Sequence, residues 1–484
     1  MSVLIICEKP SVAKTVALAL GAAEQKDGYL SGDGLLVSWC IGHLISMADA
    51  GSYDERYKKW RYEDLPILPQ AWKYAPTPGK EKQLAVLKEL LHRSDVSEVV
   101  NGCDAGREGE LIFRFVYEQA GCTKPFSRLW ISSMEDIAIR EGFAGRRAGT
   151  EYDALYQSAL CRARADWLVG INATRLFSVL YHKTLNVGRV LSPTLNLLVE
   201  RDGKITMFHK EKYHIVHIGC GGVDAESERI SDASAADALK TACEASQAVC
   251  VSLKKEKKTA LPPKLFDLTL LQREANRVYG FTAKQTLDYA QSLYEKRFLT
   301  YPRTDSNYLT EDMAQTATDL VAALLPVLPF MQGAELTPEI GRVINSAKVS
   351  DHHAIIPTME IEKTDIKALP LGERNLFLLV CCKLLCASAE PYVYEAVTAA
   401  FDCGGHSFTA KGKRVISEGW REIDRIFRAF LKEKPADGDG GTLPDFTEGQ
   451  TFDGTEVAVT EHFTQPPKPY TEAICCERGI RNRP

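Results

Sequence analysis

The chain has 484 residues, of which 45% are hydrophobic and 25% are charged. This is enough apolar material for several cores rather than one, so we expect a multidomain protein. Every apolar run is shorter than the roughly eighteen residues of a membrane-spanning helix, and a lysine soon follows the apolar start. Neither a membrane span nor a signal peptide fits this pattern, and we expect a cytoplasmic protein.

The charge and the cysteines restrict the function further. A net charge of −5 gives no overall sign of nucleic-acid binding, whose usual footprint is a basic domain, so any phosphate-binding surface must be local. The 14 cysteines lack paired C-x-x-C spacing, and several lie inside apolar runs. We interpret them as reduced, buried thiols rather than zinc ligands.

The first part of the chain predicts an α/β unit. An apolar strand over 3–7 leads through Glu8-Lys9-Pro10-Ser11 to a helix over 12–20, and a second strand over 98–103 leads through Asp104-Ala105-Gly106 to a helix. In open α/β sheets the carboxyl ends of the strands form the ligand crevice. We therefore expect Glu8 and Asp104 to face one another.

The rest of the chain alternates between helical and strand-like stretches. Residues 151–201 predict helix with a turn at 186–189, and residues 204–258 and 390–462 alternate like strands. Between these strand stretches lies a helical block with a Tyr-Pro turn, followed by a helix over 373–388. The order predicts one β-rich domain built from two pieces, with the helical block inserted and held out on a hinged arch.

The segment CDAGREGELI, residues 103–112, places acids at a strand-to-helix turn. Carboxylate oxygens suit Mg²⁺, which prefers one or two carboxylates together with water and phosphate oxygens. Glu8, Asp104, Glu108 and Glu110 are the candidate ligands. The alternative is a capped helix start, because acids near a helix N-terminus are favourable on electrostatic grounds alone.

The segment FLTYPRTDSNYL, residues 298–309, contains a candidate nucleophile. A residue before proline is biased towards extended conformations, so Tyr301 is expected to project from a turn after a helix. Arg303 can offer its planar fork of donors to a phosphate oxygen. A tyrosine needs cationic neighbours or a base before it attacks phosphorus readily, and a structural tyrosine is the alternative.

Two further segments carry weaker signals. VSDHHAIIPT, residues 349–358, contains His352, which could bind a phosphate or move a proton, although a polar turn explains it as well. NVGRVLSPTLNLLVERD, residues 186–202, combines a glycine turn with Arg189, a pattern that can approach a nucleic-acid backbone.

Together these segments resemble, in order and rough spacing, those of type IA DNA topoisomerases. EKPSVAK is similar to the opening of the family's toprim domain, DAGREGE to its second acidic motif, VGRVLSPTL to its DNA-contact segment, LTYPRTDS to its nucleophile motif and DHHAIIPT to its histidine motif. The resemblance runs from residue 1 to about residue 473. EKPS, rather than ESP, indicates the topoisomerase III branch.

The resemblance implies a multidomain torus of α/β, α and β parts with an N-terminal, Rossmann-like toprim domain. The implied domains are a toprim domain (1–142), a helical domain (143–203 plus 463–484, incomplete), a split β-rich arch (204–262 plus 385–462) and a helical domain carrying the tyrosine (263–384).

The resemblance also implies an ATP-independent isomerase that relaxes negative supercoils and decatenates DNA. Tyr301 would attack one strand and stay joined to the 5′ phosphate, Arg303 and Lys9 would neutralise developing charge, and Glu8 would manage the proton of the 3′ hydroxyl. His352 would grip a backbone phosphate. The implied Mg²⁺ ligands are Glu8, Asp104 and Glu108, and the implied DNA contacts are Asn186, Val187, Gly188, Arg189, Val190, Leu191, Arg107 and His43.

The implied partners are single-stranded or negatively supercoiled DNA and a helicase or single-strand-binding protein, for a monomer in the bacterial cytoplasm or nucleoid. Two positions depart from the family pattern. Gly106 stands where many members have a second aspartate, which predicts weaker Mg²⁺ binding, and Leu191 stands where the family often has glutamine.

The last residues depart more strongly. QPPKPYTEA, residues 465–473, resembles the return of the chain to the helical domain, but ICCERGIRNRP follows without a helical apolar stripe. Codons for this tail can be chosen that read LLRAWDTESA in a shifted frame, so we expect a frameshifted or truncated product with an incomplete helical domain and an exposed apolar face. The alternative function is a catalytically impaired single-strand DNA-binding remnant. A third candidate function is toprim primase or nuclease chemistry. It would leave the Tyr-Pro-Arg segment unexplained, because that chemistry does not need it.

Overall fold

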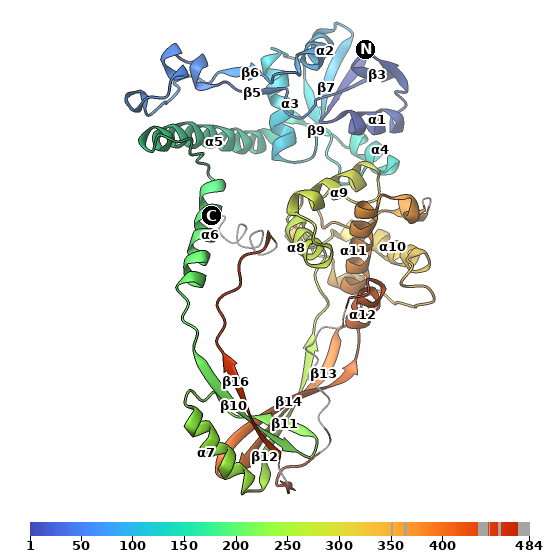
Figure 1. Cartoon of the computed structure of the whole chain (residues 1–484). Helices are drawn as coiled ribbons and strands as arrows, with labels where there is room; N and C mark the ends of the chain where they lie inside the picture. Colours follow the sequence, from blue (N-terminus) through green and yellow to red (C-terminus); the bar gives the residue numbers. More distant parts are fainter. Residues whose placement is uncertain (350–351, 363–364, 434–443, 445, 454–455, 473–484) are drawn as a thin grey trace.

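The computed structural model describes residues 1–349, 352–362, 365–433, 444, 446–453 and 456–472. Its elements follow one another around a ring made of an α/β unit, two long helices, a β-sheet and a helical block (Figure 1). The predicted fold class is therefore confirmed. Among the described helices, none combines the length and the apolar character that crossing a membrane requires.

The α/β unit contains a seven-stranded sheet in the order β2-β3-β4-β1-β7-β8-β9. Its centre is parallel because β1 pairs with both β4 and β7, and β7 pairs with β8. The strands are β1 (Ser2–Cys7), β2 (Glu24–Lys26), β3 (Tyr29–Gly32), β4 (Leu35–Trp39), β7 (Val96–Gly102), β8 (Phe126–Arg128) and β9 (Arg147–Ala148).

Helices cover both faces of this sheet. Val12 and Val16 of α1 (Pro10–Ala19) and Ile139 of α4 (Asp136–Ala144) pack on one face. Leu87 of α2 (Glu81–His92) and Phe113 of α3 (Arg107–Gln119) pack on the other. The two central strands are thus buried on both sides, which explains their continuous apolar sequence.

A hairpin of β5 (Ile45–Met47) and β6 (Tyr74–Pro76) carries an extension of the α/β unit along α5 (Asp153–Leu180). The extension contains three short turns of 3₁₀ helix, η1 (Ala50–Ser52), η2 (Glu55–Lys58) and η3 (Tyr62–Asp64). A fourth, η4 (Gly149–Tyr152), lies beside β8 and β9 at the start of α5. After α5 the chain turns into α6 (Leu191–Thr206), which has no buried residue. Four aliphatic side chains of α6 are exposed, namely Leu191, Leu195, Leu198 and Val199.

The second sheet is antiparallel, with the order β15-β12-β13-β14-β11-β10-β16. Its strands are β10 (Lys212–Cys220), β11 (Val223–Glu226), β12 (Ala248–Ala260), β13 (Tyr392–Cys403), β14 (His406–Ser417), β15 (Thr451–Phe452) and β16 (Glu456–Phe463). Helix α7 (Ala233–Glu244) packs on its buried face through Ala236 and Cys243. The sheet thus takes strands from both sides of the helical block in the sequence.

The helical block lies between β12 and β13, two neighbouring strands of that sheet. Its helices are α8 (Leu268–Tyr279), α9 (Ala283–Glu295), α10 (Ala314–Val327) and α11 (Leu371–Ser388), with η5 (Glu311–Met313), η6 (Ile340–Arg342), η7 (Ser346–Lys348), η8 (Met359–Glu362) and η9 (Ile366–Ala368). In Figure 1, α9 lies next to α4, so the block meets the α/β unit and closes the ring.

The structure corrects two of the strand predictions. Residues 233–244 form a helix, capped where Asp232 accepts a hydrogen bond from the Ala235 amide at 3.0 Å. Residues 420–430 form α12 (Trp420–Phe430), whose Ile423 and Phe427 join the core of the helical block rather than that of the sheet. Both helices are short amphipathic pieces inside long strand-rich stretches, where the strand pattern dominated the prediction.

Pro193 lies in the first turn of α6, where a proline costs no hydrogen bond. The predicted thiols are confirmed: of the twelve cysteines in the described ranges, eleven are buried and all are free. The domain boundaries remain predictions. The proposed frameshifted tail at 473–484 lies outside the described residues.

Candidate active site

Two buried carboxylates lie at the ends of neighbouring strands. Because β1 and β7 pair in parallel with Cys7 opposite Gly102, the residues that follow each strand emerge at the same edge. Glu8 is 6% exposed and Asp104 is 7% exposed. Within the described part of the chain, one oxygen of each, Glu8 Oε2 and Asp104 Oδ2, is buried without a hydrogen-bond partner. The sequence predicted this pairing.

Both acids have a raised pKa, chiefly because they are buried. Burial raises the pKa of Glu8 to about 7, with a further contribution from the charge of Asp104, against the lowering effect of Lys9, Arg303 and His43. Burial also raises the pKa of Asp104 above its usual range. A carboxyl group that titrates near neutral pH can act as both an acid and a base.

Arg128, which the sequence analysis missed, fixes the loop that carries Asp104. It is almost fully buried and donates hydrogen bonds to the carbonyl oxygens of Asn101 at 2.9 Å, Cys103 at 2.7 Å and Asp104 at 2.7 Å. A fork of donors aimed at successive carbonyls locks the backbone at the strand end. Its sequence context, a short strand with no motif, gave no signal.

Glu110, considered as a metal ligand, has a structural role instead. Its carboxylate accepts hydrogen bonds from Asn101 at 2.8 Å and Arg114 at 2.9 Å, and lies 3.2 Å from Arg128 Nε. It is completely buried. Two residues after Glu108 on a helix, it points into the core rather than towards the strand-end crevice.

Tyr301 lies after α9, outside any helix, as the proline predicted. The expectation that it projects from its turn is wrong, because it is only 5% exposed and belongs to the core around α1 and β1. Its amide donates a hydrogen bond to the carbonyl of Ser132 at 2.9 Å. Burial, followed by the charge of Asp104, raises the pKa of Tyr301, whereas the charge of Arg303 opposes this increase.

His352 lies against Tyr301, with ring centroids 4.4 Å apart, and stacks on Trp130. Its Nδ1 accepts a hydrogen bond from the Ser132 hydroxyl at 2.9 Å, and its Nε2 donates to the carbonyl of Ala105. Burial lowers the pKa of His352 to about 4. The ring is therefore neutral at physiological pH, and both of its nitrogens are occupied by groups of the α/β unit.

Ion pairs complete the contact between the α/β unit and the helical block. Glu295, at the end of α9, pairs with Lys9 at 3.0 Å and accepts a hydrogen bond from Ser11 at 2.9 Å. Arg297 pairs with Asp136 at 2.7 Å. Glu295 and Ser132 were missed in the sequence because nothing local indicates which residues meet across an interface.

The other predicted residues lie around this centre. Arg303 and Arg107 are exposed, and the charge of Arg303 also lowers the pKa of Glu108. Glu108 lies outside the buried pair and accepts a hydrogen bond from His43 Nε2 at 3.3 Å. That bond is the main reason why the pKa of Glu108 is lowered.

The predicted DNA-contact segment 186–191 lies between α5 and α6, away from the buried acids. Arg189 pairs with Asp166 of α5 at 2.7 Å, and Arg162 lies 3.9 Å from the same carboxylate. The charge of Arg162 in turn lowers the pKa of Glu108. A row of charges along α5 thus connects the segment with the strand ends.

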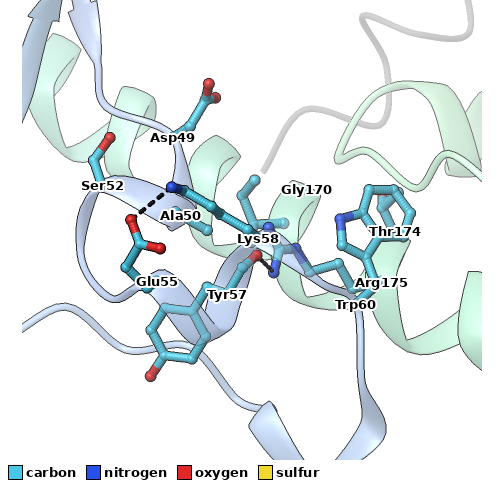
Figure 2. Close-up of a pocket in the computed structure, with 12 residues that line it drawn as sticks. Asp49, Ala50, Ser52, Glu55, Tyr57, Lys58, Trp60, Gly170, Thr174 and Arg175 are labelled. Carbon is cyan, nitrogen blue, oxygen red and sulfur yellow. Dashed lines mark hydrogen bonds and ion pairs between the residues drawn. The ribbon is translucent and has the colours of Figure 1, made fainter.

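A pocket of about 670 Å³ lies on the other side of this segment, between residues 49–60 and α5 (Figure 2). Arg175 donates a hydrogen bond to the carbonyl of Tyr57 at 2.7 Å, and its guanidinium lies 5.5 Å from the ring of the half-exposed Trp60. Thr174, which also lines the pocket, accepts a hydrogen bond from Val187 at 2.9 Å. The surrounding sequence, RYKKWRY at 56–62, interleaves bases with aromatics.

Comparisons with known proteins agree with this arrangement. The family described as DNA topoisomerase matches residues 150–475, and the Toprim domain matches residues 3–134. DNA topoisomerase 3 of Bacillus licheniformis is 39% identical over 482 residues, covering 97% of this chain and 66% of the relative. DNA topoisomerase 3 of Bacillus subtilis is 38% identical with the same coverage. The chain thus spans slightly less than two thirds of the length of these relatives.

A similar fold is found in the full-length topoisomerase I of Thermotoga maritima, with a TM-score of 0.74 over 99% of this chain and 75% of that one. The sequences are 24% identical, so this match supports the fold alone.

Gly109 offers a direct test of how the Asp104 loop is held. A Cβ at this position would lie 2.0 Å from the carbonyl oxygen of Asp104, so the loop rests directly on the first turn of α3. We expect Gly109→Ala to cost about 2 kcal/mol or more through overpacking and to lower the calorimetric unfolding midpoint. Gly203→Ala in α6, where a Cβ meets no atom within 4 Å, is the control and should not lower the midpoint. Equal midpoints would contradict this view of the loop.

Proposed function

The chain belongs to the type IA DNA topoisomerases, and we propose that it cuts one DNA strand through Tyr301, passes another strand through the break and reseals it without ATP. The observation that supports this most is the position of Tyr301 against the α/β unit, where its pKa responds to Asp104, Glu8 and Arg303. A nucleophile, an acid–base group and a cation are thereby brought to one place.

In the proposed cleavage step, the Tyr301 oxygen forms a bond to phosphorus as the bond to the 3′ oxygen breaks. Glu8, protonated at its raised pKa of about 7, gives its proton to the leaving 3′ oxygen. Tyr301 gives up its proton to solvent and stays joined to the 5′ phosphate. Religation reverses these transfers: Glu8 takes the proton of the 3′ hydroxyl, and Tyr301 regains one.

Cations stabilise the charge that develops at the phosphate. The charge of Arg303 already acts on Tyr301, Glu8 and Asp104. It lowers the pKa of each group against the larger raising effect of burial. Lys9 is held by Glu295 at 3.0 Å, so a DNA phosphate would replace that carboxylate as its partner. One such charge-stabilising donor contributes about 3 kcal/mol to a transition state elsewhere.

The buried acids also fit a magnesium site. Glu8 Oε2 and Asp104 Oδ2 lack hydrogen-bond partners within the described residues, and hard oxygen ligands are what Mg²⁺ prefers. Glu8 and Asp104 would hold the ion, with Glu108 joining them after leaving His43. The positive charge of the Mg²⁺ ion would help to keep the cut ends aligned for resealing.

We further propose that the contact around Tyr301 is the gate. Lys9–Glu295, Arg297–Asp136 and the Ser132–His352 bond all join the α/β unit to the helical block. Separating them would lift the tyrosine and the attached 5′ end away from the strand ends. His352, once free of Ala105, could then bind a backbone phosphate.

The proposed substrate is single-stranded or negatively supercoiled DNA. Its path would run from the Trp60 pocket past Arg189 to the strand ends, because these sites are connected along α5. Aromatic rings and cations side by side bind single strands of any sequence by stacking and phosphate contacts. Binding should weaken with salt as counterions are released. We also propose that the protein works as a monomer in the bacterial cytoplasm or nucleoid. Its proposed partner there is a helicase or a single-strand-binding protein.

The central test is a covalent adduct. A labelled single-stranded oligonucleotide incubated with the purified chain should give an adduct on a denaturing gel, and Tyr301→Phe should abolish it. Tyr308→Phe, a tyrosine on the same loop, should retain it. Omitting Mg²⁺ should impair resealing more than cutting.

The alternative, a single-strand DNA-binding remnant, makes the opposite prediction. Salt-dependent binding without any adduct from the parent chain would overturn the proposed activity and favour that alternative. An adduct that persists in Tyr301→Phe would overturn the assignment of the nucleophile.

The proposed role of Glu8 predicts the pH dependence of cutting. Since the protonated form is the acid and its pKa is raised to about 7, single-turnover cutting without metal should slow as pH rises through about 7. The apparent pKa belongs to the coupled Glu8–Asp104 pair, so Asp104→Asn should shift the midpoint to lower pH. A profile unchanged by Asp104→Asn would contradict this role.

Gly106 provides a test of the metal site. A Cβ there meets no atom within 4 Å, and the backbone φ of 165° is open to any residue. Gly106→Asp should therefore add a carboxylate near the ion and tighten Mg²⁺ binding about tenfold, or about 1.4 kcal/mol, measured by calorimetry. Gly106→Asn is the uncharged control and should bind like the parent. Equal affinity of the Asp and Asn variants would contradict the predicted weak site.

A further inference from the structure

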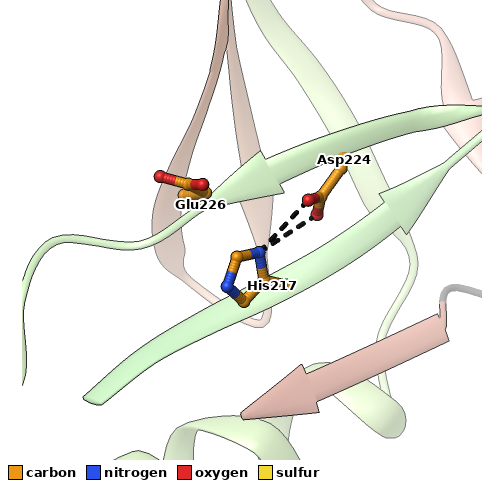
Figure 3. A group of neighbouring side chains, drawn as sticks. All are labelled: His217, Asp224 and Glu226. Atoms are coloured by element: carbon orange, nitrogen blue, oxygen red, sulfur yellow. Dashed lines mark hydrogen bonds and ion pairs between the residues drawn. The ribbon is translucent and has the colours of Figure 1, made fainter. Parts of the chain in front are cut away.

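A histidine and two carboxylates cluster on the second sheet (Figure 3), which lies at the opposite end of the ring from the α/β unit against which Tyr301 packs (Figure 1). One ligand atom from each of His217, Asp224 and Glu226 lies within 4.8 Å of the others. We propose that these side chains bind a divalent first-row transition cation, with Zn²⁺ as the best fit. This site is separate from the proposed reaction and does not depend on it.

The strand register builds the cluster. His217 on β10 lies opposite Glu226 on β11, and Gly219 lies opposite Asp224. All four positions share one face, because residues two apart on a strand point the same way. Gly219 has no side chain, so the Asp224 carboxylate can lean diagonally towards His217, where its oxygens lie 3.2 and 3.3 Å from Nδ1.

The charges in the cluster do not balance. Two carboxylates share a single imidazole, and the Glu226 carboxylate has no hydrogen bond or ion pair to any described residue. Arg229 and Lys411 line the adjoining hollow, but among the described residues neither forms an ion pair with these acids. A bound cation would compensate the excess negative charge.

The second ring nitrogen of His217 has a hydrogen-bond partner, as a metal-binding imidazole requires. His217 Nε2 lies 2.8 Å from Thr460 Oγ1 on β16, and that hydroxyl also lies 2.8 Å from His462 Nε2 and 3.4 Å from the carbonyl of Ile215. With a cation on Nδ1, Nε2 would donate a hydrogen bond to Thr460, and the Thr460 hydroxyl would donate to His462 Nε2, the nearer of its two acceptors. Such an outer hydrogen bond fixes the tautomer and orientation of metal-binding histidines.

The donor set selects the kind of metal. One imidazole nitrogen with carboxylate oxygens suits Zn²⁺ and its neighbours better than Mg²⁺, which prefers oxygen alone. Ligands about 2.0–2.1 Å from a tetrahedral zinc lie about 3.3 Å from one another. The separation of 3.2 Å between His217 Nδ1 and Asp224 Oδ2 matches this spacing.

Binding would hold in place the strand that borders a weak point of the sheet. The paired register between β11 and β14 has a single residue pair, Glu226 with Thr409. A cation held by His217, Asp224 and Glu226 would tie β11 to β10 at this place, and through Thr460 to β16. Zn²⁺ should therefore protect the sheet against unfolding.

The test is Zn²⁺ titration by calorimetry, with the absorption bands of Co²⁺ as a second readout. The untagged full chain carries Asp104→Asn together with Cys161→Ser, Cys475→Ser and Cys476→Ser, which removes as competing ligands the acid pair, the exposed thiol among the described residues and the two thiols near the end of the sequence. We expect one saturable site. His217→Gln and Asp224→Asn should each weaken it at least tenfold, whereas the exposed His209→Gln should have no effect.

Thr460 separates a built site from adventitious binding. Thr460→Val should weaken Zn²⁺ about tenfold, and Thr460→Ser should restore it, because only the hydroxyl is needed. Absence of a saturable site, or equal affinity in the parent background, His217→Gln and Asp224→Asn, would overturn the proposal. Asp224 is two-thirds exposed, so its variant remains informative if His217→Gln disturbs the fold.

Discussion

The parallel pairing of β1 with β7 forces two carboxylates into one small, dry space. Glu8 and Asp104 follow strands that end side by side, and neither can move away without breaking the register of the sheet. Arg128, which pairs with Glu110, fixes the end of β7 by donating a hydrogen bond to the carbonyl of Asp104. The cost of burying like charges is offset by protons, by nearby cations or by a metal ion. In the proposed chemistry the proton is transferred, and the cations and the metal ion stabilise charge.

The same acid pair acts on the phenol of Tyr301. Burial and the charge of Asp104 both raise the pKa of its phenol, so the neutral form is strongly favoured. In the proposed reaction, a bound cation would lower the pKa of this phenol, as the charge of Arg303 already does. Glu295 would then leave Lys9 to a DNA phosphate.

The sequence predicted what is local and periodic. The strand ends and the start of α3 follow from short patterns and are found where expected. Tyr301, before Pro302, lies outside any helix, as its proline predicted. The burial of Tyr301 and the partners of His352 could not be predicted in this way, because they come from segments of the α/β unit that are distant in the sequence, among them Ser132 and Ala105. Glu110 was considered as a metal ligand because of its charge. Its position on α3 turns its side chain into the core, away from the proposed metal site.

The arch determines how such an interface could separate. Both ends of the helical block continue into β12 and β13, and β14, which pairs with β13 along its length, leads into α12 in the core of the block. The block is therefore carried on three paired strands, and bending of these strands would move Tyr301 as a unit with α8–α11. Further along the sheet, the junction between β11 and β14 has a single residue pair, and the His217 cluster lies beside it on β10 and β11. A cation there would stiffen this end of the sheet and leave the three strands that lead to the block as the flexible part.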